Sequence, residues 1–198
     1  MTGANFAWPK RGDQAFKPYP AAGVRPRLEA FVLPSDGAYL VGFQRAGDMI
    51  VEGARASDRT PHNLFFPVAY LYRHHLELML KELVRLGVRV GRFDRTEKSL
   101  TEHNLVKLWN NVKELIKEVW PDSPEDDINA VEAVIKEFHR LDKSGQAFRY
   151  ARDLHGCPHL KEAPQTVDLG NLKGTVDAVS AFLDAAYAGI EQCDPGQP

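Results

Sequence analysis

The sequence predicts an all-α fold, an antiparallel bundle of about five helices preceded by a Pro- and aromatic-rich N-terminal arm. Three observations predict this fold. Apolar residues recur at three- and four-residue spacing in five stretches, which is the period of a buried helix face. Almost no stretch alternates with the two-residue period of a strand. Mostly short turns join the five stretches, and short connections favour antiparallel neighbours.

Composition and charge place the 198-residue chain among ordinary globular domains. Apolar residues make up 43% and charged residues 26%, and the length is sufficient for one sizeable core. The formal charge is −2, so only a local basic patch would indicate a nucleic-acid binder. We expect no membrane span and no secretory signal. Cys157 and Cys193 form no disulfide framework, so we expect a cytoplasmic protein.

Residues 1–36 predict an extended arm rather than a helix. Prolines are so frequent there that a long helix is excluded. Aromatic side chains lie among them, including Trp8, Phe16 and Tyr19, and they indicate an arm that packs on protein. The helical bundle is expected to span residues 37–191, and residues 192–198 to form a tail.

Each predicted helix has its own start or stop signal. The first begins at Asp36, a favourable N-cap, and the second follows Pro61 and ends at Gly87. The third ends before Pro121, and Ser123 caps the fourth. The fifth has the cleanest apolar stripe in the chain. The five predicted spans are about 36–57, 60–86, 103–120, 124–141 and 169–192.

Residues 142–168 predict a long irregular segment, because Gly and Pro interrupt them repeatedly. Such a loop inside a compact domain is usually functional or disordered. It contains four side chains suited to a binding site: Arg149, Tyr150, Asp153 and His155. The guanidinium of Arg149 can bind a carboxylate or a phosphate in a bidentate manner. The alternative is a structural salt bridge with Glu77 or with an acidic residue of the fourth helix.

Arg73, Glu77 and Lys81 recur every four residues on the second predicted helix. Their ridge also carries apolar residues that look like core positions, namely Phe66, Tyr70 and Val84. One interpretation is a solvated face with i,i+4 ion pairs. The other is a buried charge network that shapes a pocket or an interface, because buried charges must be paired. The apolar surroundings favour burial.

His103, at the entry to the third helix, is a further candidate. A histidine beside a helix N-terminus can contact an anion bound there, and the alternative is a capping or tertiary hydrogen bond. His155, Cys157 and His159 alternate, but a structural zinc site needs four ligands with recognisable spacing. We therefore predict no metal and no cofactor. The chain also lacks a Gly-rich phosphate loop and a nucleophile elbow.

Three segments, in order, resemble the HEPN superfamily of helical domains. Residues 76–83 (LELMLKEL) look like its long second helix, where Glu-Leu-x-x-Lys is common. Residues 102–108 (EHNLVKL) are similar to the His-x-Leu-x-x-Leu segment that follows that helix. Phe148-Arg149-Tyr150 resembles the Arg-Tyr element before the last helix. Together the segments cover roughly residues 37–191.

The resemblance implies a four- to five-helix bundle that often dimerises. Many members are metal-independent ribonucleases of toxin–antitoxin or defence systems, in which an Arg-x(4–6)-His motif of two protomers meets across the interface. There the His acts on the ribose 2′-hydroxyl and the Arg stabilises the phosphorane-like charge. Arg149 and His155 match this spacing. Other members lack the motif and bind nucleotides or proteins, and the Arg-Tyr form looks more like these.

Two main hypotheses follow. In the first, a polar cluster faces RNA or a nucleotide phosphate, and Arg149 with His155 or His103 is catalytic. That cluster comprises Arg73, Glu77, Lys81, His103, Arg149 and Asp153, and Tyr150 also contacts the ligand. In the second, the chain is a non-catalytic module for homodimerisation or for a protein partner, and the cluster is an internal ion-pair network. A third hypothesis is an enzyme acting on a phosphorylated small molecule.

These hypotheses predict different surroundings for the cluster. Exposed Arg and His side chains in a cleft favour the first. Buried side chains that satisfy one another favour the second.

Overall fold

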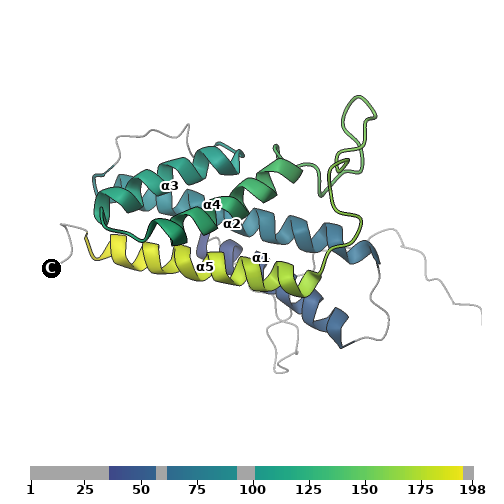
Figure 1. The fold of residues 1–198 in the computed structure, drawn as a ribbon, viewed down its shortest axis with the longest axis horizontal. Helices are drawn as coiled ribbons and strands as arrows, with labels where there is room; N and C mark the ends of the chain where they lie inside the picture. The colour runs from purple at the N-terminus through teal and green to yellow at the C-terminus, as the bar shows by residue number, and fades with distance from the viewer. Residues whose placement is uncertain (1–35, 57–61, 93–100, 194–198) are drawn as a thin grey trace, which may run out of the picture. The chain divides into compact units, whose positions relative to one another are not determined.

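Five α-helices form the fold in the computed structural model, which describes residues 36–56, 62–92 and 101–193 (Figure 1). The helices are α1 (Asp36–Arg55), α2 (Phe65–Arg89), α3 (Leu105–Val119), α4 (Glu125–Leu141) and α5 (Leu169–Glu191), with a short 3-10 turn η1 (His62–Leu64) before α2. The predicted all-α helical bundle is confirmed. The predicted arm, apart from its last residue, lies outside the described residues, as does most of the predicted tail.

Helix α2 is the centre of the bundle. It packs against α1, α3 and α5, while α4 packs mainly on α3. Its buried residues include Leu76, Leu80 and Leu83, which are almost fully inaccessible to water, and each such side chain contributes about 1.5–3 kcal/mol. Within the described part of the chain, no helix is both long and apolar enough to cross a bilayer.

Histidine 75 joins three helices inside this core. Its Nδ1 lies 3.0 Å from the Leu40 carbonyl oxygen of α1, and its Nε2 lies 2.8 Å from the Ser180 hydroxyl of α5. Because a carbonyl only accepts, Nδ1 donates to Leu40 and Nε2 accepts from Ser180. Burial lowers the pKa of His75 and keeps the ring neutral.

The end of α2 differs from the prediction, because Gly91 rather than Gly87 terminates it. The Gly91 amide donates to the Val88 carbonyl at 3.1 Å, and the Arg92 amide donates to the Gly87 carbonyl at 2.9 Å. This pair of bonds requires a left-handed residue, and Gly91 has φ of +73°. Gly87 is buried and continues the helix. The predicted end at Gly87 was therefore wrong by one helical turn.

The start of α4 also differs from the prediction. The Ser123 hydroxyl donates to the Trp120 carbonyl at 2.6 Å and does not cap the helix. Acidic residues occupy the first turn of α4 and basic residues the last, which is the favourable arrangement for the helix dipole. Residues 142–168 are irregular, as predicted, apart from one isolated bridge between Arg152 and Pro158.

Candidate functional site

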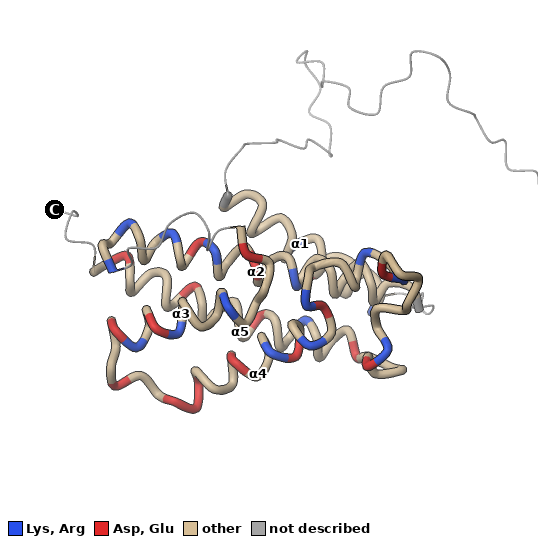
Figure 2. The backbone as a smooth tube through the Cα atoms, turned by 90° about the horizontal axis from the view of Figure 1, so that it is seen from above, with Lys and Arg blue, Asp and Glu red and all other residues tan. Residues whose placement is uncertain are grey.

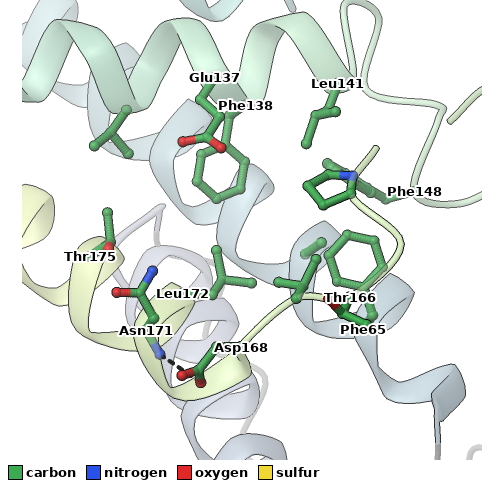
Figure 3. A pocket seen from close by; sticks show the side chains of 14 residues that line it. Phe65, Glu137, Phe138, Leu141, Phe148, Thr166, Asp168, Asn171, Leu172 and Thr175 are labelled. Carbon is green, nitrogen blue, oxygen red and sulfur yellow. Dashed lines mark hydrogen bonds between the residues drawn. The ribbon is translucent and has the colours of Figure 1, made fainter. Parts of the chain in front are cut away.

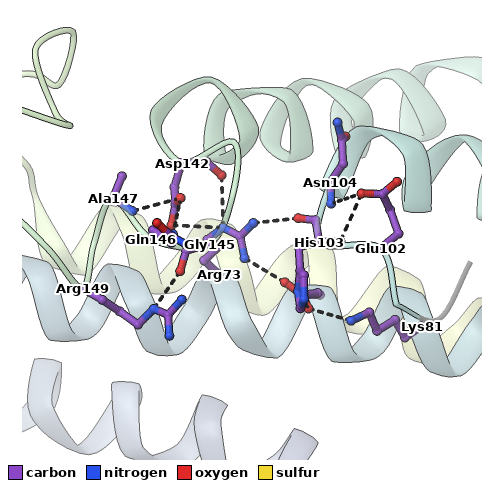
Figure 4. Close-up of polar contacts among 11 residues, drawn as sticks. Arg73, Lys81, Glu102, His103, Asn104, Asp142, Gly145, Gln146, Ala147 and Arg149 are labelled. Carbon is purple, nitrogen blue, oxygen red and sulfur yellow. Dashed lines mark hydrogen bonds and ion pairs between the residues drawn. The ribbon is translucent and has the colours of Figure 1, made fainter. Parts of the chain in front are cut away.

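Glu77 lies at the centre of a buried charge network on α2, and Figure 4 shows its partners Arg73, Lys81 and His103. Its side chain is 2% exposed, and one carboxylate oxygen accepts from Arg73 Nη1 at 2.8 Å. The other oxygen accepts from Lys81 Nζ at 2.8 Å and from His103 Nδ1 at 2.9 Å. Burial alone would raise the pKa of Glu77, but these hydrogen bonds outweigh burial and hold the pKa at about 2. The carboxylate is therefore ionised at neutral pH.

Arg73 connects this network to two other parts of the fold. Its Nη2 donates to the His103 carbonyl at 2.8 Å, and its Nε donates to the Asp142 carbonyl at 3.2 Å. The Asp142 carboxylate also lies 3.3 Å from Nε. Figure 4 shows Arg73 between His103 on one side and the turn at Asp142 and Gly145 on the other. Arg73 therefore holds the entry of α3 and the exit of α4 against α2.

The turn beside Arg73 requires glycine at position 145. Gly145 has φ of +77°, and a Cβ atom there would lie 3.1 Å from Arg73 Nη1. The Asp142 carboxylate stabilises the same turn by accepting from the amides of Gln146 and Ala147 at 2.8 and 3.1 Å. Asp142 was not among the site residues predicted from the sequence. Its only local signal was an acidic residue directly after the last residue of α4.

The buried interpretation of the α2 ridge is therefore correct. Arg73 and Glu77 are both 2% exposed, and Lys81 is also buried. Each of the three has an oppositely charged partner within the network. The three side chains form ion pairs with one another, and Glu77 also binds His103. None of the three is exposed.

His103 is the exposed member of the network. Its side chain is 65% exposed although Nδ1 contacts a buried carboxylate. Because the ionised Glu77 carboxylate only accepts, Nδ1 is the donor of this bond, and Nε2 has no hydrogen-bond partner among the described residues. The start of α3 is already capped by Asn104, whose side chain accepts from the Lys107 amide at 3.0 Å. The structure thus favours the tertiary hydrogen bond over a helix-terminus anion site.

Arg149 lies on an aromatic surface rather than in a salt bridge. Its Nε donates to the Gly145 carbonyl at 2.8 Å, and its Cζ lies 5.7 Å from the Tyr70 ring centroid and 5.6 Å from that of Tyr150. Such distances are typical of cation–π contacts. The structure gives Arg149 no ion pair with Glu77 or with any other carboxylate of the described residues. Its guanidinium is therefore available to a ligand.

The aromatic residues around Arg149 extend along α2. The Tyr70 and His74 rings are stacked with centroids 5.8 Å apart. Phe66 is 47% exposed and Tyr150 is 57% exposed, so the expectation that Phe66 is a core residue was wrong. We call this set the aromatic platform: Phe66, Tyr70, His74, Arg149 and Tyr150.

The aromatic platform and His103 lie at different heights along α2. Tyr70, which contacts Arg149, precedes Glu77, which contacts His103, by seven residues. At 1.5 Å per residue this is a separation of about 10 Å. Arg149 and His103 therefore contact α2 about two helical turns apart.

Asp153 and His155 lie in an exposed turn of the irregular segment. The Asp153 carboxylate accepts from the amides of His155 and Cys157 at 2.9 and 2.8 Å. The His155 side chain is exposed, and neighbouring Leu154 is fully exposed. Asp153 therefore serves this turn and not the Glu77 network. Of the two predicted histidine partners, the structure places His103 in the network and His155 outside it.

A separate, largely apolar cavity of about 260 Å³ lies between α2, α4 and α5. Figure 3 shows Glu137 of α4 and Asn171 of α5 on its lining, with Phe65 and Phe148 nearby. None of the site residues predicted from the sequence lines it. Among the described residues, no group of three or more His, Cys, Asp or Glu side chains is placed to hold a metal ion.

Comparisons with protein-family models, with curated proteins and with solved structures returned no match. The HEPN resemblance stays a prediction that rests on its three sequence segments.

Proposed function

We propose that the chain is a HEPN-like domain that binds RNA along α2 and cleaves it without a metal, with His103 as the acid–base residue. One observation carries this proposal: an exposed imidazole is held by a buried, ionised carboxylate. A carboxylate on Nδ1 fixes the tautomer and the orientation of the ring, and it stabilises the imidazolium that forms when Nε2 takes a proton.

The proposed chemistry is transesterification within RNA. His103 Nε2 removes the proton of a ribose 2′-hydroxyl, and the resulting oxyanion attacks the adjacent phosphorus. The bond from phosphorus to the 5′-oxygen breaks, and the departing 5′-oxygen takes up a proton. The products are a 2′,3′-cyclic phosphate and a 5′-hydroxyl end. No step requires a redox change or a metal.

The aromatic platform supplies binding in this proposal. Arg149 and Tyr150 are exposed, and Tyr70 lies against the guanidinium. Aromatic and guanidinium planes stack on bases of single-stranded RNA, and each stacked base contributes about 1–3 kcal/mol. Because Arg149 and His103 contact α2 about two turns apart, Arg149 would hold a nucleotide that flanks the cleaved bond.

A homodimer would complete the active site. The resemblance implies catalytic groups from two protomers, and a second His103 would supply the general acid that protonates the leaving oxygen. The proposed toxin or defence setting rests on the same resemblance alone, and the proposed cytoplasmic location rests on the two cysteines that form no disulfide framework.

The test is cleavage of a mixed-sequence RNA in EDTA by the wild type and by the variants His103→Ala and Arg149→Ala. We expect His103→Ala to lower the cleavage rate by about 10²–10⁴-fold, the usual contribution of a general base. Arg149→Ala should mainly weaken RNA binding. Unchanged helical circular dichroism would show that both variants are folded. Cleavage by His103→Ala at the wild-type rate would exclude the proposed role.

The second candidate function is a non-catalytic interaction module. The observation that favours it is the mutual satisfaction of Arg73, Glu77 and Lys81 inside the bundle. In that case the network only stabilises the fold. A folded wild type that neither binds nor cleaves RNA would favour this function.

A further inference from the structure

The pairing of cationic side chains changes abruptly along the chain. In the described part, every Lys and Arg between residues 73 and 136 has a carboxylate partner within 4 Å. Between residues 140 and 161, no such ion pair is present among the described residues. The unpaired cations of this stretch are Arg140, Lys143, Arg149, Arg152 and Lys161.

Three of these cations line one polar hollow of about 290 Å³. Arg140, Lys143 and Lys161 lie on its wall, together with Ser144 and His159. The hollow lies where α4 ends and the irregular segment folds back past it. Figure 2 shows the charge of α4 changing from acidic near its start to basic near its end. We call this hollow the basic pocket.

The basic pocket carries an excess of positive charge. Two carboxylates also line it, those of Asp142 and Glu162. Asp142 is buried and already compensated by Arg73 and by two backbone amides. The three cations therefore face one uncompensated carboxylate, which leaves two positive charges in excess. Cations held together without counter-charges repel one another, so an anion bound there is stabilised.

We propose that the basic pocket binds a phosphate group. The guanidinium of Arg140 can form two parallel hydrogen bonds to phosphate oxygens, and the two lysines act as point charges. Ser144 and His159 add two further hydrogen-bond donors. The phosphate belongs either to the backbone of an RNA strand or to the terminal phosphate of a nucleotide. The RNA source rests on the proposed function, whereas the nucleotide source does not.

The position of the pocket suits an RNA strand that also reaches the aromatic platform. Ala147 lines the pocket, and Arg149 follows two residues later. Asp142 also lines the pocket, and its carboxylate contacts Arg73 of the Glu77 network. The pocket therefore adjoins the platform along the chain and the Glu77 network through Asp142, and the proposed RNA strand runs past them.

The test measures binding of three probes by titration calorimetry: inorganic phosphate, adenosine 5′-monophosphate, and a short single-stranded RNA without terminal phosphates. The variants are Arg140→Gln, Lys143→Gln and Lys161→Gln. The matched control is Arg45→Gln, an exposed cation on α1 that also has no carboxylate partner in the described residues. We expect each pocket variant to bind about three- to tenfold more weakly, which corresponds to one hydrogen bond of ordinary net strength, and the control to bind normally.

The probes separate the two sources of phosphate. Weakened binding of the mononucleotide and of inorganic phosphate supports a terminal phosphate site. Weakened binding of the RNA, with a salt dependence reduced by about one unit per substitution, supports a backbone site. Unchanged binding of all three probes by the pocket variants, or an equal loss in the Arg45→Gln control, overturns the proposal.

Failure of this proposal can be distinguished from failure of the proposed function. His103→Ala should abolish cleavage and leave phosphate binding in the pocket unchanged, since His103 does not line it. If pocket variants bind normally while cleavage still depends on His103, only the basic pocket is refuted. If phosphate binding depends on the pocket but no cleavage occurs, only the proposed cleavage is refuted.

Discussion

The Glu77 network and the segment between residues 140 and 161 use the same kinds of charged residues in opposite ways. In the network, Arg73 and Lys81 are buried and paired with one carboxylate. In the segment, Arg140, Lys143 and Lys161 line a hollow without such partners. Burial and pairing, rather than residue type, decide which cations hold the fold and which are available to a ligand.

Among variants of the two regions, we expect substitution of Glu77 to lower the free energy of unfolding most. Glu77→Ala leaves Lys81 buried without a counter-charge and Arg73 with Asp142 as its remaining carboxylate, and we expect a loss of about 3–5 kcal/mol in the free energy of unfolding. Urea unfolding measures it. The control is Glu125→Gln, which removes the exposed partner of Lys117 and one acidic residue of the first turn of α4 and should cost no more than about 1 kcal/mol. Equal midpoints for the two variants would contradict the structural role of the network.

The pH dependence of stability should show the same carboxylate. The pKa of Glu77 is about 2 in the fold, against an ordinary 4.5. A lowered pKa stabilises the fold above the ordinary value, so about 3 kcal/mol is lost as the pH falls from 4.5 towards 2. Burial also lowers the pKa of His75 from 6.5. The stability that the neutral ring contributes is therefore lost as the pH falls below 6.5, before the loss from Glu77 begins. Urea unfolding of wild type and Glu77→Gln across this range checks it, since the variant should lack the steeper acidic part.

Gly145, in the turn beside Arg73, can be compared with Gly156, in the exposed turn at Asp153. Gly145 and Gly156 both have positive φ, but only at Gly145 would a Cβ atom approach Arg73. We expect Gly145→Ala to cost about 2 kcal/mol and Gly156→Ala about 1 kcal/mol. Thermal unfolding of the two variants measures the difference. A larger loss at Gly156 would mean that the contact with Arg73 is unimportant.

The smallest expected effect is on the stability of the basic pocket variants. Lys143→Gln and Lys161→Gln remove exposed cations with no carboxylate partner in the described residues, and the free energy of unfolding should stay within about 0.5 kcal/mol of wild type. Urea unfolding of the same variants that are used in the binding titrations measures this free energy. A loss comparable to that of Glu77→Ala would place these lysines with the structural charges and remove the contrast between the two regions.

The sequence was sufficient to predict the five helices, but it did not predict every helix end correctly. The apolar stripes of α3 and α5 have an unambiguous period, and both helices lie where they were predicted. At the end of α2, two glycines lie four residues apart, and only the backbone hydrogen bonds of Gly91 distinguish them. Ser123 was a plausible cap by type, but its hydroxyl bonds back to Trp120.

The candidate site was predictable where its contacts are local. Arg73, Glu77 and Lys81 are spaced by one helical turn, so their mutual pairing could be expected from the sequence. Asp142 could not, because its contact with Arg73 depends on how α4 packs against α2. The spacing of the Arg-x(4–6)-His motif pointed to His155, whereas the tertiary contact with Glu77 involves His103.

The central claim is that His103, and not His155, is the acid–base residue of a metal-independent ribonuclease. The most direct measurement is the rate of RNA cleavage in EDTA by His103→Ala and His155→Ala, compared at equal concentration with the wild type. We expect His103→Ala to lose about 10²–10⁴-fold in rate and His155→Ala to cleave like the wild type. Loss of cleavage in His155→Ala with normal cleavage by His103→Ala would contradict the central claim.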